Sequence, residues 1–273
     1  MIDKTVSVII PVYNGRRTIR KCLSSLVRQG YGVKEIIVID DGSTDDTRDI
    51  VREFGVKLLR QEHKGPGAAR NLGVSKAAGE IIVFVDSDEY CGEDYVKNLI
   101  RPILESKTIG TVSTDVHVAN ADNQWAKCWS ISHGLSLSNL SIRIAETDIF
   151  RAVLRSKFLE AGGFEESIGY SDDRLAQKLG VKAYTVGNAR FEHEYPSSLK
   201  DIYKHAVWIG KGEDSRKHPF INIVVHFFPI SLARGFIKSL KYHEWSFIIF
   251  KTIFDFGLIV GVIKAVFMKE YSK

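Results

Sequence analysis

The strongest constraint on the fold is a regular alternation of short apolar runs with helical patterns in the first third of the chain. The runs are residues 6–10, 36–39, 56–59 and 81–85, and most of their residues are β-branched or aliphatic. Continuous apolar runs of this kind are typical of strands buried on both faces of a parallel sheet. Strands that alternate with helices predict βαβ units, so we expect an α/β fold with a mostly parallel central sheet.

Polar residues gather where these strands leave the core. Asp40 and Asp41 follow the second run, a glycine-rich loop from Lys64 to Arg70 follows the third, and Asp86 follows the fourth. Ligands of such sheets bind at the carboxyl ends of the strands, so this edge is the expected site. The loop lacks the P-loop pattern, and no GxGxxG sequence follows the first run. Lys64 and Arg70 are candidates for holding a diphosphate, and a solvated basic loop is the alternative.

Asp86 and Asp88 stand two residues apart at the end of the fourth run. Side chains at positions i and i+2 of a strand point the same way, so both carboxylates converge if the backbone stays extended through Ser87. Two adjacent like charges are unfavourable unless a cation neutralises them. A Mg²⁺ or Mn²⁺ ion accepts such carboxylates and completes its shell with water and phosphate oxygens. A solvated acidic turn is the alternative.

Length and composition limit the class of protein. The chain has 273 residues, of which 44% are apolar, and this fits one large α/β domain, alone or with an appendage. Cys22, Cys91 and Cys128 show no CxxC spacing, so we expect neither a disulfide framework nor a zinc site, and a reducing compartment. The first residues show no signal-peptide pattern. No nucleic-acid partner is expected.

Seven short motifs follow one another along the chain. They are SVIIPVYN at residues 7–14, DDGSTD at 40–45, GAARNLG at 67–73, FVDSD at 84–88, FRAVLR at 150–155, GGFEE at 162–166 and DDRLAQKLG at 172–180. This ordered set, over roughly residues 5–200, resembles glycosyltransferase family 2. The resemblance implies a GT-A fold, which is a Rossmann-like sheet flanked by helices. It also implies an inverting, metal-dependent enzyme that uses a nucleotide-sugar donor of the UDP or GDP type.

The resemblance assigns some residues to the donor nucleotide. Pro11, Tyr13 and Asp41 are expected around the nucleobase and ribose, where Asp41 accepts a hydrogen bond from a base N–H. Asp40 belongs to the same donor-binding motif. Capping of the following helix is the alternative role for both aspartates. Arg70 is expected near the diphosphate.

The resemblance assigns other residues to the metal and to catalysis. Asp88 is the expected main ligand of Mn²⁺ or Mg²⁺, and Asp86 is expected on the ribose or the ion. His193 stands where an imidazole completes the shell of the ion, and a hydrogen-bonding role alone is the alternative. Asp172 is the expected catalytic base, with Asp173 as the fallback if the register differs by one residue.

These roles imply a single displacement that inverts the anomeric centre. A carboxylate removes the proton of the acceptor hydroxyl, while the metal ion neutralises the departing diphosphate. The expected acceptor is a lipid-linked or growing glycan. Direct transfer to polyprenyl phosphate stays open as a close alternative. A sugar-nucleotide pyrophosphorylase and a non-catalytic scaffold are the alternatives from other classes.

We expect a catalytic domain over residues 1–217, with a donor half over about 1–115 and an acceptor half over about 116–217. In the acceptor half Trp125, Trp129 and His133 stand among Ser, Asn and Gly. Their aromatic faces suit a sugar or lipid acceptor, and packing of the tryptophans into a core is an equal alternative.

The last segment, residues 218–273, has a different composition. From Lys200 onward the chain has 12 Lys and Arg residues but only 6 Asp and Glu residues, so all of the net positive charge lies in this quarter of the chain. Residues 220–232 and 245–268 are strongly apolar, and the second stretch is long enough to span a bilayer but contains three formal charges.

A helical wheel places Glu244, Lys251, Asp255 and Lys269 in one narrow stripe of this last helix. We therefore expect the C-terminal helices to lie in the membrane interface, at the cytoplasmic face of the cell membrane. A spanning helix is one alternative. A helical pair packed on the catalytic domain, or in a homo-oligomer, is the other.

Overall fold

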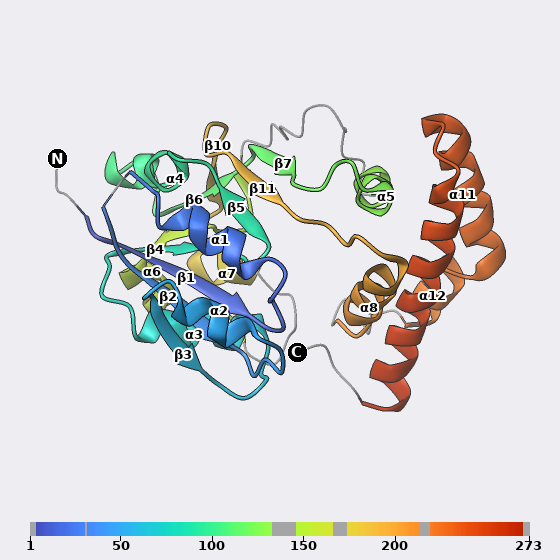
Figure 1. The fold of residues 1–273 in the computed structure, drawn as a ribbon, viewed down its shortest axis with the longest axis horizontal. Coiled ribbons are helices and arrows are strands. Elements are labelled where there is room, and N and C mark those ends of the chain that lie inside the picture. Colours follow the sequence, from blue (N-terminus) through green and yellow to red (C-terminus); the bar gives the residue numbers. More distant parts are fainter. Residues whose placement is uncertain (1–3, 31, 133–145, 166–173, 213–218, 270–273) are drawn as a thin grey trace.

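The computed structural model describes residues 4–30, 32–132, 146–165, 174–212 and 219–269. Its centre is an eight-stranded sheet with the order β3-β2-β1-β4-β9-β6-β10-β8 (Figure 1). The bounds of these strands are β1 Val6–Val12, β2 Val33–Asp40, β3 Lys57–Arg60, β4 Ile81–Phe84, β6 Gly110–Ser113, β8 Glu146–Thr147, β9 Ala152–Leu154 and β10 Ala183–Val186. The first four run parallel, and β9 is antiparallel to both of its neighbours. The predicted α/β fold with a mostly parallel sheet is confirmed.

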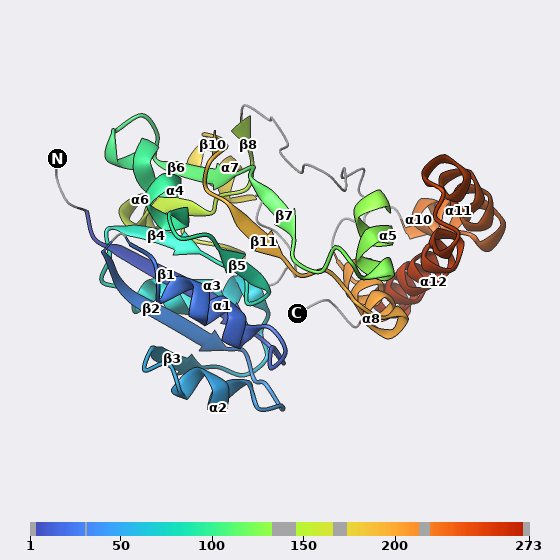
Figure 2. The same cartoon turned by 45° about the horizontal axis from the view of Figure 1, so that its top comes forward.

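Helices cover both faces of this sheet because the strand residues alternate between two cores. In β1, Val8 and Ile10 belong to one core, and Ile9 between them belongs to the other. The first core includes residues of α1 (Ile19–Leu26), α2 (Thr47–Arg52) and α4 (Tyr95–Leu104). The second includes residues of α3 (Pro66–Ser75), α6 (Arg155–Glu160) and α7 (Arg174–Leu179). Figure 2 shows the sheet between these two layers.

Helix α3 lies unusually close to the sheet. A Cβ atom at Gly73 would lie 2.5 Å from Ile9 Cγ2 and 2.7 Å from Ile39 Cδ1, so any larger residue at this crossing would force these isoleucine side chains to shift. The register pairs Val12 with Asp40, and Asp40 with Arg60, at the ends of three parallel strands. The first turn of α3 begins directly after the loop that follows β3, and it thereby reaches the same carboxyl edge.

A second, three-stranded sheet extends from this edge. Strand β11 (Phe191–His193) lies between β5 (Glu89–Cys91) and β7 (Val116–Val118), antiparallel to β5 and parallel to β7. Its register places His193 opposite Glu89, one residue after Asp88. The small sheet therefore places β11, from late in the chain, beside β5, which follows β4 (Figure 1).

The remaining helices form a separate unit, drawn in green to red on one side of the molecule in Figures 1 and 2. They are α5 (Gln124–Ser132), α8 (Leu199–Gly210), α10 (Pro219–Val225), α11 (Phe228–Tyr242) and α12 (Ser246–Phe267). Helix α12 packs along α8, α11 and α5. A third hydrophobic core joins α5, α8 and α12, and it includes Trp129, which is 6% exposed.

Two expectations for the acceptor half bear on this unit. Trp129 is a core residue whose ring lies stacked with that of Tyr195 and meets Phe254 edge to face. It therefore matches the alternative in which the tryptophans pack into a core, and not the one in which they contact an acceptor. Trp125 is partly buried against the same core, while His133 lies outside the described residues. The domain boundary at residue 217 stays a prediction, although α5 and α8, which precede it, share their core with α12.

Candidate active site

The carboxyl edge of the sheet carries Asp40 as the last residue of β2. Its side chain is fully buried, and its Oδ1 accepts a hydrogen bond from the Ser43 backbone N–H at 3.0 Å. Arg48 Nε lies 3.7 Å from its Oδ2. The following helix begins only at Thr47, with Asp46 as N-cap. Asp40 therefore closes the turn after β2, and it does not cap α2.

Asp41 holds the glycine-rich loop against this turn. Its Oδ1 accepts hydrogen bonds from Gln61 Nε2 at 2.7 Å and from Lys64 N at 2.8 Å. Its Oδ2 accepts one from Gly65 N at 2.9 Å and lies 2.8 Å from His63 Nδ1. An ionised carboxylate has about four acceptor sites. The loop therefore occupies the acceptor sites of Asp41 in this structure.

An aromatic pair flanks Asp41. The ring of Tyr13, which is 48% exposed, stacks on His63 with centroids 4.0 Å apart and an angle of 19° between the ring planes. Pro11 lies within β1 opposite Ile39. Sequence reasoning missed His63, although its place in the glycine-rich loop, next to Lys64, was a usable signal.

Asp86 lies between two guanidinium groups. Arg70 Nη2 donates to its Oδ1 at 2.7 Å, and Arg151 Nη1 donates to its Oδ2 at 2.9 Å. Burial opposes the charged form, but Arg151 and Arg70 together hold the pKa of Asp86 well below its usual range. Arg70 is itself 4% exposed and lies 5.5 Å from the ring of Phe164. Asp86 therefore stays ionised and fixes Arg70 at the edge.

Arg151 also joins Glu89 to this cluster. Its Nη2 lies 2.9 Å from Glu89 Oε1, and Glu89 Oε2 accepts a hydrogen bond from Asp86 N at 3.0 Å. Burial raises the pKa of Glu89 to about 7; the charge of Asp86 adds to this rise and Arg151 opposes it. Sequence reasoning gave neither residue a role. Arg151 lies in the FRAVLR motif and Glu89 directly follows Asp88, so both were within recognised segments.

The condition for Asp86 and Asp88 to converge, an extended backbone through Ser87, is not met. Strand β4 ends at Phe84, and the Glu89 N–H donates to the Asp86 carbonyl at 3.0 Å, which closes a turn. The two carboxylates consequently have different neighbours. Asp86 binds the arginines, whereas Asp88 Oδ2 lies 3.4 Å from His193 Nε2. Burial lowers the pKa of His193, but the nearby charge of Asp88 outweighs it and raises that pKa to about 9.

Asp88 and His193 are the donors that fit a divalent ion. Their side chains are 42% and 30% exposed, and Asp88 offers a carboxylate oxygen. Because the pKa of His193 is raised to about 9, its imidazole nitrogen becomes a ligand only when an ion displaces the ring proton. No group of three or more His, Cys, Asp or Glu side chains suited to a metal occurs among the residues described here. Mg²⁺ and Mn²⁺ often take only one or two protein ligands, with water and substrate phosphates completing the shell. Both oxygens of Asp86 are already bound to arginines, so that residue fits the ion less well.

The predicted base, Asp172, and its fallback, Asp173, lie outside the described residues. The described residues on either side of them are joined by an ion pair, because Arg174 Nη1 donates to Glu165 Oε2 at 2.6 Å. A Cβ atom at Gly67 would lie 3.0 Å from the Glu165 carbonyl oxygen, so this backbone passes against the first turn of α3. Glu165, the last described residue before the predicted base, therefore lies beside the glycine-rich loop.

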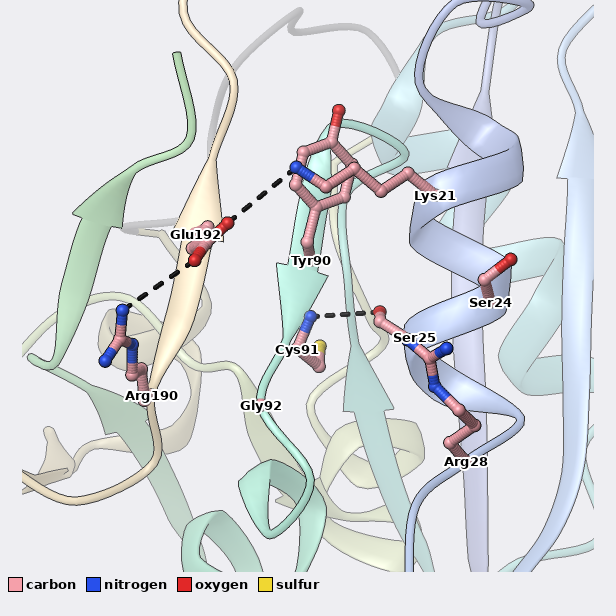
Figure 3. Close-up of a pocket in the computed structure, with 9 residues that line it drawn as sticks. All are labelled: Lys21, Ser24, Ser25, Arg28, Tyr90, Cys91, Gly92, Arg190 and Glu192. Carbon is pink, nitrogen blue, oxygen red and sulfur yellow. Dashed lines mark hydrogen bonds and ion pairs between the residues drawn. The ribbon is translucent and has the colours of Figure 1, made fainter. Parts of the chain in front are cut away.

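A pocket of about 220 Å³ lies between α1 and the β5–β11 pair (Figure 3). Lys21 Nζ sits 3.9 Å from the centre of the Tyr90 ring, and Lys21 and Arg190 flank Glu192 at 3.8 and 3.7 Å. None of the predicted site residues lines this pocket. Glu192 precedes His193 on β11, and neighbouring residues of a strand point to opposite faces, so the pocket lies behind the Asp88–His193 pair.

Structural comparison defines the fold first. Mannosyltransferase PcManGT from Pyrobaculum calidifontis, crystallised with GDP-Man and Mn²⁺, matches 97% of this chain and 88% of its own with a TM-score of 0.60 at 22% identity. TarS 1–349 of S. aureus, crystallised with UDP-GlcNAc, matches 98% of this chain and 93% of its own with a TM-score of 0.56 at 18% identity. The fold is that of the GT-A glycosyltransferases.

Sequence comparison then defines the family. The family model of glycosyl transferase family 2 matches residues 7–161, so the chain belongs to that family and is a glycosyltransferase. EpsH of Bacillus subtilis is 29% identical over the whole of this chain and 72% of its own length. Glycosyltransferase GlyA of Streptococcus pneumoniae is 41% identical over 110 residues, which are 38% of this chain but only 16% of GlyA. The predicted resemblance and enzyme class are confirmed.

Proposed function

We propose that the protein transfers one sugar from a nucleotide-diphosphate sugar to an acceptor hydroxyl, with inversion at the anomeric carbon. The observation that carries this proposal is the gathering of Asp41, Arg70 and Asp88 at one carboxyl edge of a GT-A sheet. The glycosyltransferase structures crystallised with GDP-Man and UDP-GlcNAc support a donor of the GDP or UDP type.

The proposed donor site begins at the turn after β2. Tyr13 supplies an exposed aromatic face for the nucleobase, beside Pro11, and Asp41 supplies the acceptor for a base N–H. The four contacts from the loop to Asp41 mean that the loop rearranges when the base binds. Asp40 supports the turn from within the core. This arrangement predicts that donor binding and loop position are coupled.

The diphosphate is proposed to bind between Lys64 and Arg70. Lys64 is exposed, and the N-terminus of α3 lies between the two residues, where its unpaired N–H groups and dipole favour an anion. Asp86 holds Arg70 in place through the 2.7 Å hydrogen bond. Asp88 and His193 would hold a Mn²⁺ or Mg²⁺ ion, which when bound supplies neutralisation of the charge that builds on the departing nucleoside diphosphate.

Catalysis is proposed to depend on Asp172. A carboxylate next to the acceptor hydroxyl removes its proton as the new bond forms, and general-base help of this kind contributes about 10² to 10⁴ in rate. Because the attack and the departure of the diphosphate take place on opposite faces of the sugar, an α-linked donor gives a β-linked product. Asp173 is the fallback for the same role.

The acceptor is proposed to be a lipid-linked or growing glycan at the cytoplasmic face of the cell membrane. One described helix, α12, is long and apolar enough to cross a membrane, and 44% of its most apolar window is buried inside the protein. This helix and its neighbours would keep the enzyme at the membrane surface, where lipid-linked acceptors are found. We treat residues 218–273 as the membrane-associating segment of a catalytic domain over 1–217.

A donor screen with product analysis tests this proposal. The full chain is incubated with UDP- and GDP-sugars, Mn²⁺ and a lipid extract, and the products are identified by mass spectrometry. Metal-dependent formation of a glycosidic bond is the expected result. A single-sugar phosphodiester of a polyprenol would show transfer to polyprenyl phosphate. Release of a nucleoside triphosphate in the presence of pyrophosphate, or no turnover of any donor, would contradict the proposal.

A further inference from the structure

The exposed apolar side chains are concentrated in one region of the molecule. Of the 22 large apolar side chains that are exposed in the described residues, 17 lie between residues 219 and 268, on α10, α11 and α12 or the turns between them. Phe220 is 79% exposed, Phe267 73% and Ile237 64%. A water-soluble surface seldom carries an apolar area of this extent, which marks a place where a membrane or another protein binds.

The polarity of this region is reversed relative to a soluble helical bundle. The exposed positions of α12 are Ile249, Phe256, Ile263, Val266 and Phe267, and all are apolar. These residues recur at intervals of seven or four, so most of them form one stripe along the helix. The stripe faces away from the protein over the length of α12.

Two of the three charges of α12, Lys251 and Asp255, point into the protein. Asp255 is 1% exposed, and its Oδ1 and Oδ2 accept hydrogen bonds from Lys251 Nζ at 2.5 and 2.6 Å. His226 Nδ1 lies 2.8 Å from Asp255 Oδ1. The two middle members of the expected polar stripe, Lys251 and Asp255, are therefore enclosed between helices, whereas Lys269 at its end is exposed. Charges that face the bundle interior and pair there are typical of helices surrounded by lipid.

Small residues form the contacts between these helices. Helix α11 buries Ser231, Gly235 and Ser239 against α12 and exposes its larger apolar residues. Helix α12 places Gly261 so close to α8 that a Cβ atom would lie 2.3 Å from the Val207 carbonyl oxygen. Small residues at helix contacts, with large apolar residues outside, are again the arrangement found in membranes. If the exposed apolar residues instead formed the interface of a soluble dimer, small residues would not be required at the contacts between helices within each subunit.

The packing of α12 also restricts its direction. Along one side it lies on α5 and α8, which belong to the water-exposed part of the protein: Lys200 and Lys204 of α8 are exposed, and Lys127 of α5 pairs with Glu244 at 2.7 Å. If α12 crossed a bilayer, α8 would enter the hydrocarbon with it. Helices α10 and α11 meet at a bend of 51°, which shortens the distance that they can reach into a membrane.

We propose that α10, α11 and α12 form an in-plane membrane anchor that inserts its apolar outer face into one leaflet of a lipid bilayer. Lipids with anionic headgroups fit this anchor best, because the exposed Arg234 and Lys241 lie among its apolar residues and the C-terminal quarter is basic. This inference deepens the membrane association of the proposed function. Its test measures lipid binding and not sugar transfer, so the anchor and the proposed transferase activity can be disproved separately.

Vesicle binding of substituted proteins tests the anchor. The full chain is sedimented with vesicles of phosphatidylcholine that contain about one-third phosphatidylglycerol. Phe256→Lys combined with Ile263→Lys should lower the apparent affinity roughly tenfold or more, because both side chains would carry charge into the apolar part of the leaflet. Leu159→Lys combined with Val181→Lys is the matched control, since these residues are 48% and 44% exposed on the catalytic side. The control should bind as the native chain does.

Accessibility of the two ends of α12 distinguishes an in-plane helix from a spanning one. His243→Cys and Met268→Cys place single reactive thiols at these exposed ends, because Cys22, Cys91 and Cys128 are buried. On sealed vesicles a membrane-impermeant maleimide should label both ends. Protection of one end would show a spanning helix and overturn the proposal. The proposal would also be overturned if the Phe256→Lys, Ile263→Lys variant bound vesicles as tightly as the native chain, or if the native chain formed a soluble dimer that did not bind vesicles.

Discussion

Asp86 shows how far one residue can be interpreted from its sequence neighbours. Its spacing from Asp88 indicated a shared metal site, and the structure separates the two carboxylates by a turn. The partners of Asp86 are Arg70 and Arg151, which lie 16 and 65 residues away in sequence. No local pattern can report such contacts. By contrast, the resemblance to glycosyltransferase family 2 placed His193 near Asp88 as a metal ligand, with hydrogen bonding alone as the alternative, and in the structure His193 Nε2 lies 3.4 Å from Asp88 Oδ2.

Replacement of Arg151 by Met tests this cluster. Arg151 pairs with both Glu89, which is 1% exposed, and the partly buried Asp86. The change removes this shared cation from both carboxylates. Breaking a buried ion pair from one side typically costs about 3 kcal/mol or more. The free energy of unfolding from urea titration should fall by about this amount. Arg20→Met is the control, because the Arg20–Glu53 pair lies in water and its loss should leave stability almost unchanged.

The role of Asp172 is also a claim at the residue scale. Asp172→Asn should lower the transfer rate by about 10² to 10⁴, because the amide cannot accept the proton of the acceptor. Donor binding, measured by calorimetry, should stay close to native. Asp173→Asn is the matched control and should retain most of the activity. If Asp172→Asn kept the native turnover and Asp173→Asn lost it, the catalytic base would be Asp173 and not Asp172.

At the scale of elements, the apolar runs predicted β1 to β4. The runs of β1, β2 and β4 are buried on both faces, whereas β3 is a partly exposed edge strand of the sheet. The three-residue strands β5, β7 and β11 were not predicted, because such short strands depend on partners far along the chain and not on their own pattern. The helical wheel likewise found the polar stripe of α12 but not the direction in which it points. That direction depends on His226, which belongs to another part of the chain.

Glu35 gives a test at this scale because it connects β2 to two neighbouring elements. Its Oε1 accepts hydrogen bonds from Ser7 Oγ of β1 at 2.7 Å and from Ala78 N, before β4, at 2.6 Å. Partial burial opposes the charged form, but the bonds from Ala78 and Ser7 and the charge of Lys57 outweigh it and lower the pKa of Glu35 below its ordinary value of 4.5.

The ionised carboxylate of Glu35 therefore stabilises the fold above pH 4.5, and this contribution is lost as the pH falls through its lowered pKa. Glu35→Gln should melt below the native chain at pH 7, and the gap should narrow as the pH drops below 4.5. Melting curves followed by circular dichroism measure this gap. A gap that stays constant over the whole range would show that the charge of Glu35 contributes nothing.

At the scale of the whole molecule, sequence reasoning identified the GT-A architecture and the separate character of the C-terminal segment. It could not show that α5 and α8 share a core with α12, because the pairing of Trp129 with Phe254 spans 125 residues. The result is a molecule with a water-exposed catalytic part and a basic, apolar helical unit. Strand β11 leads from the Asp88–His193 pair to α8, and α8 packs against α12 of the proposed anchor (Figure 2).

The central claim is that the carboxyl edge of the sheet binds a nucleoside diphosphate together with a divalent ion held by Asp88 and His193. Calorimetric titration of UDP and GDP into the full chain, with and without Mn²⁺, tests it most directly. The native protein and the exposed control variant Asp122→Ala should bind one of the two nucleotides more tightly with Mn²⁺, and Asp88→Ala should lose this enhancement. If Asp88→Ala keeps the native dependence on Mn²⁺, or if the native chain shows none, the claim is contradicted.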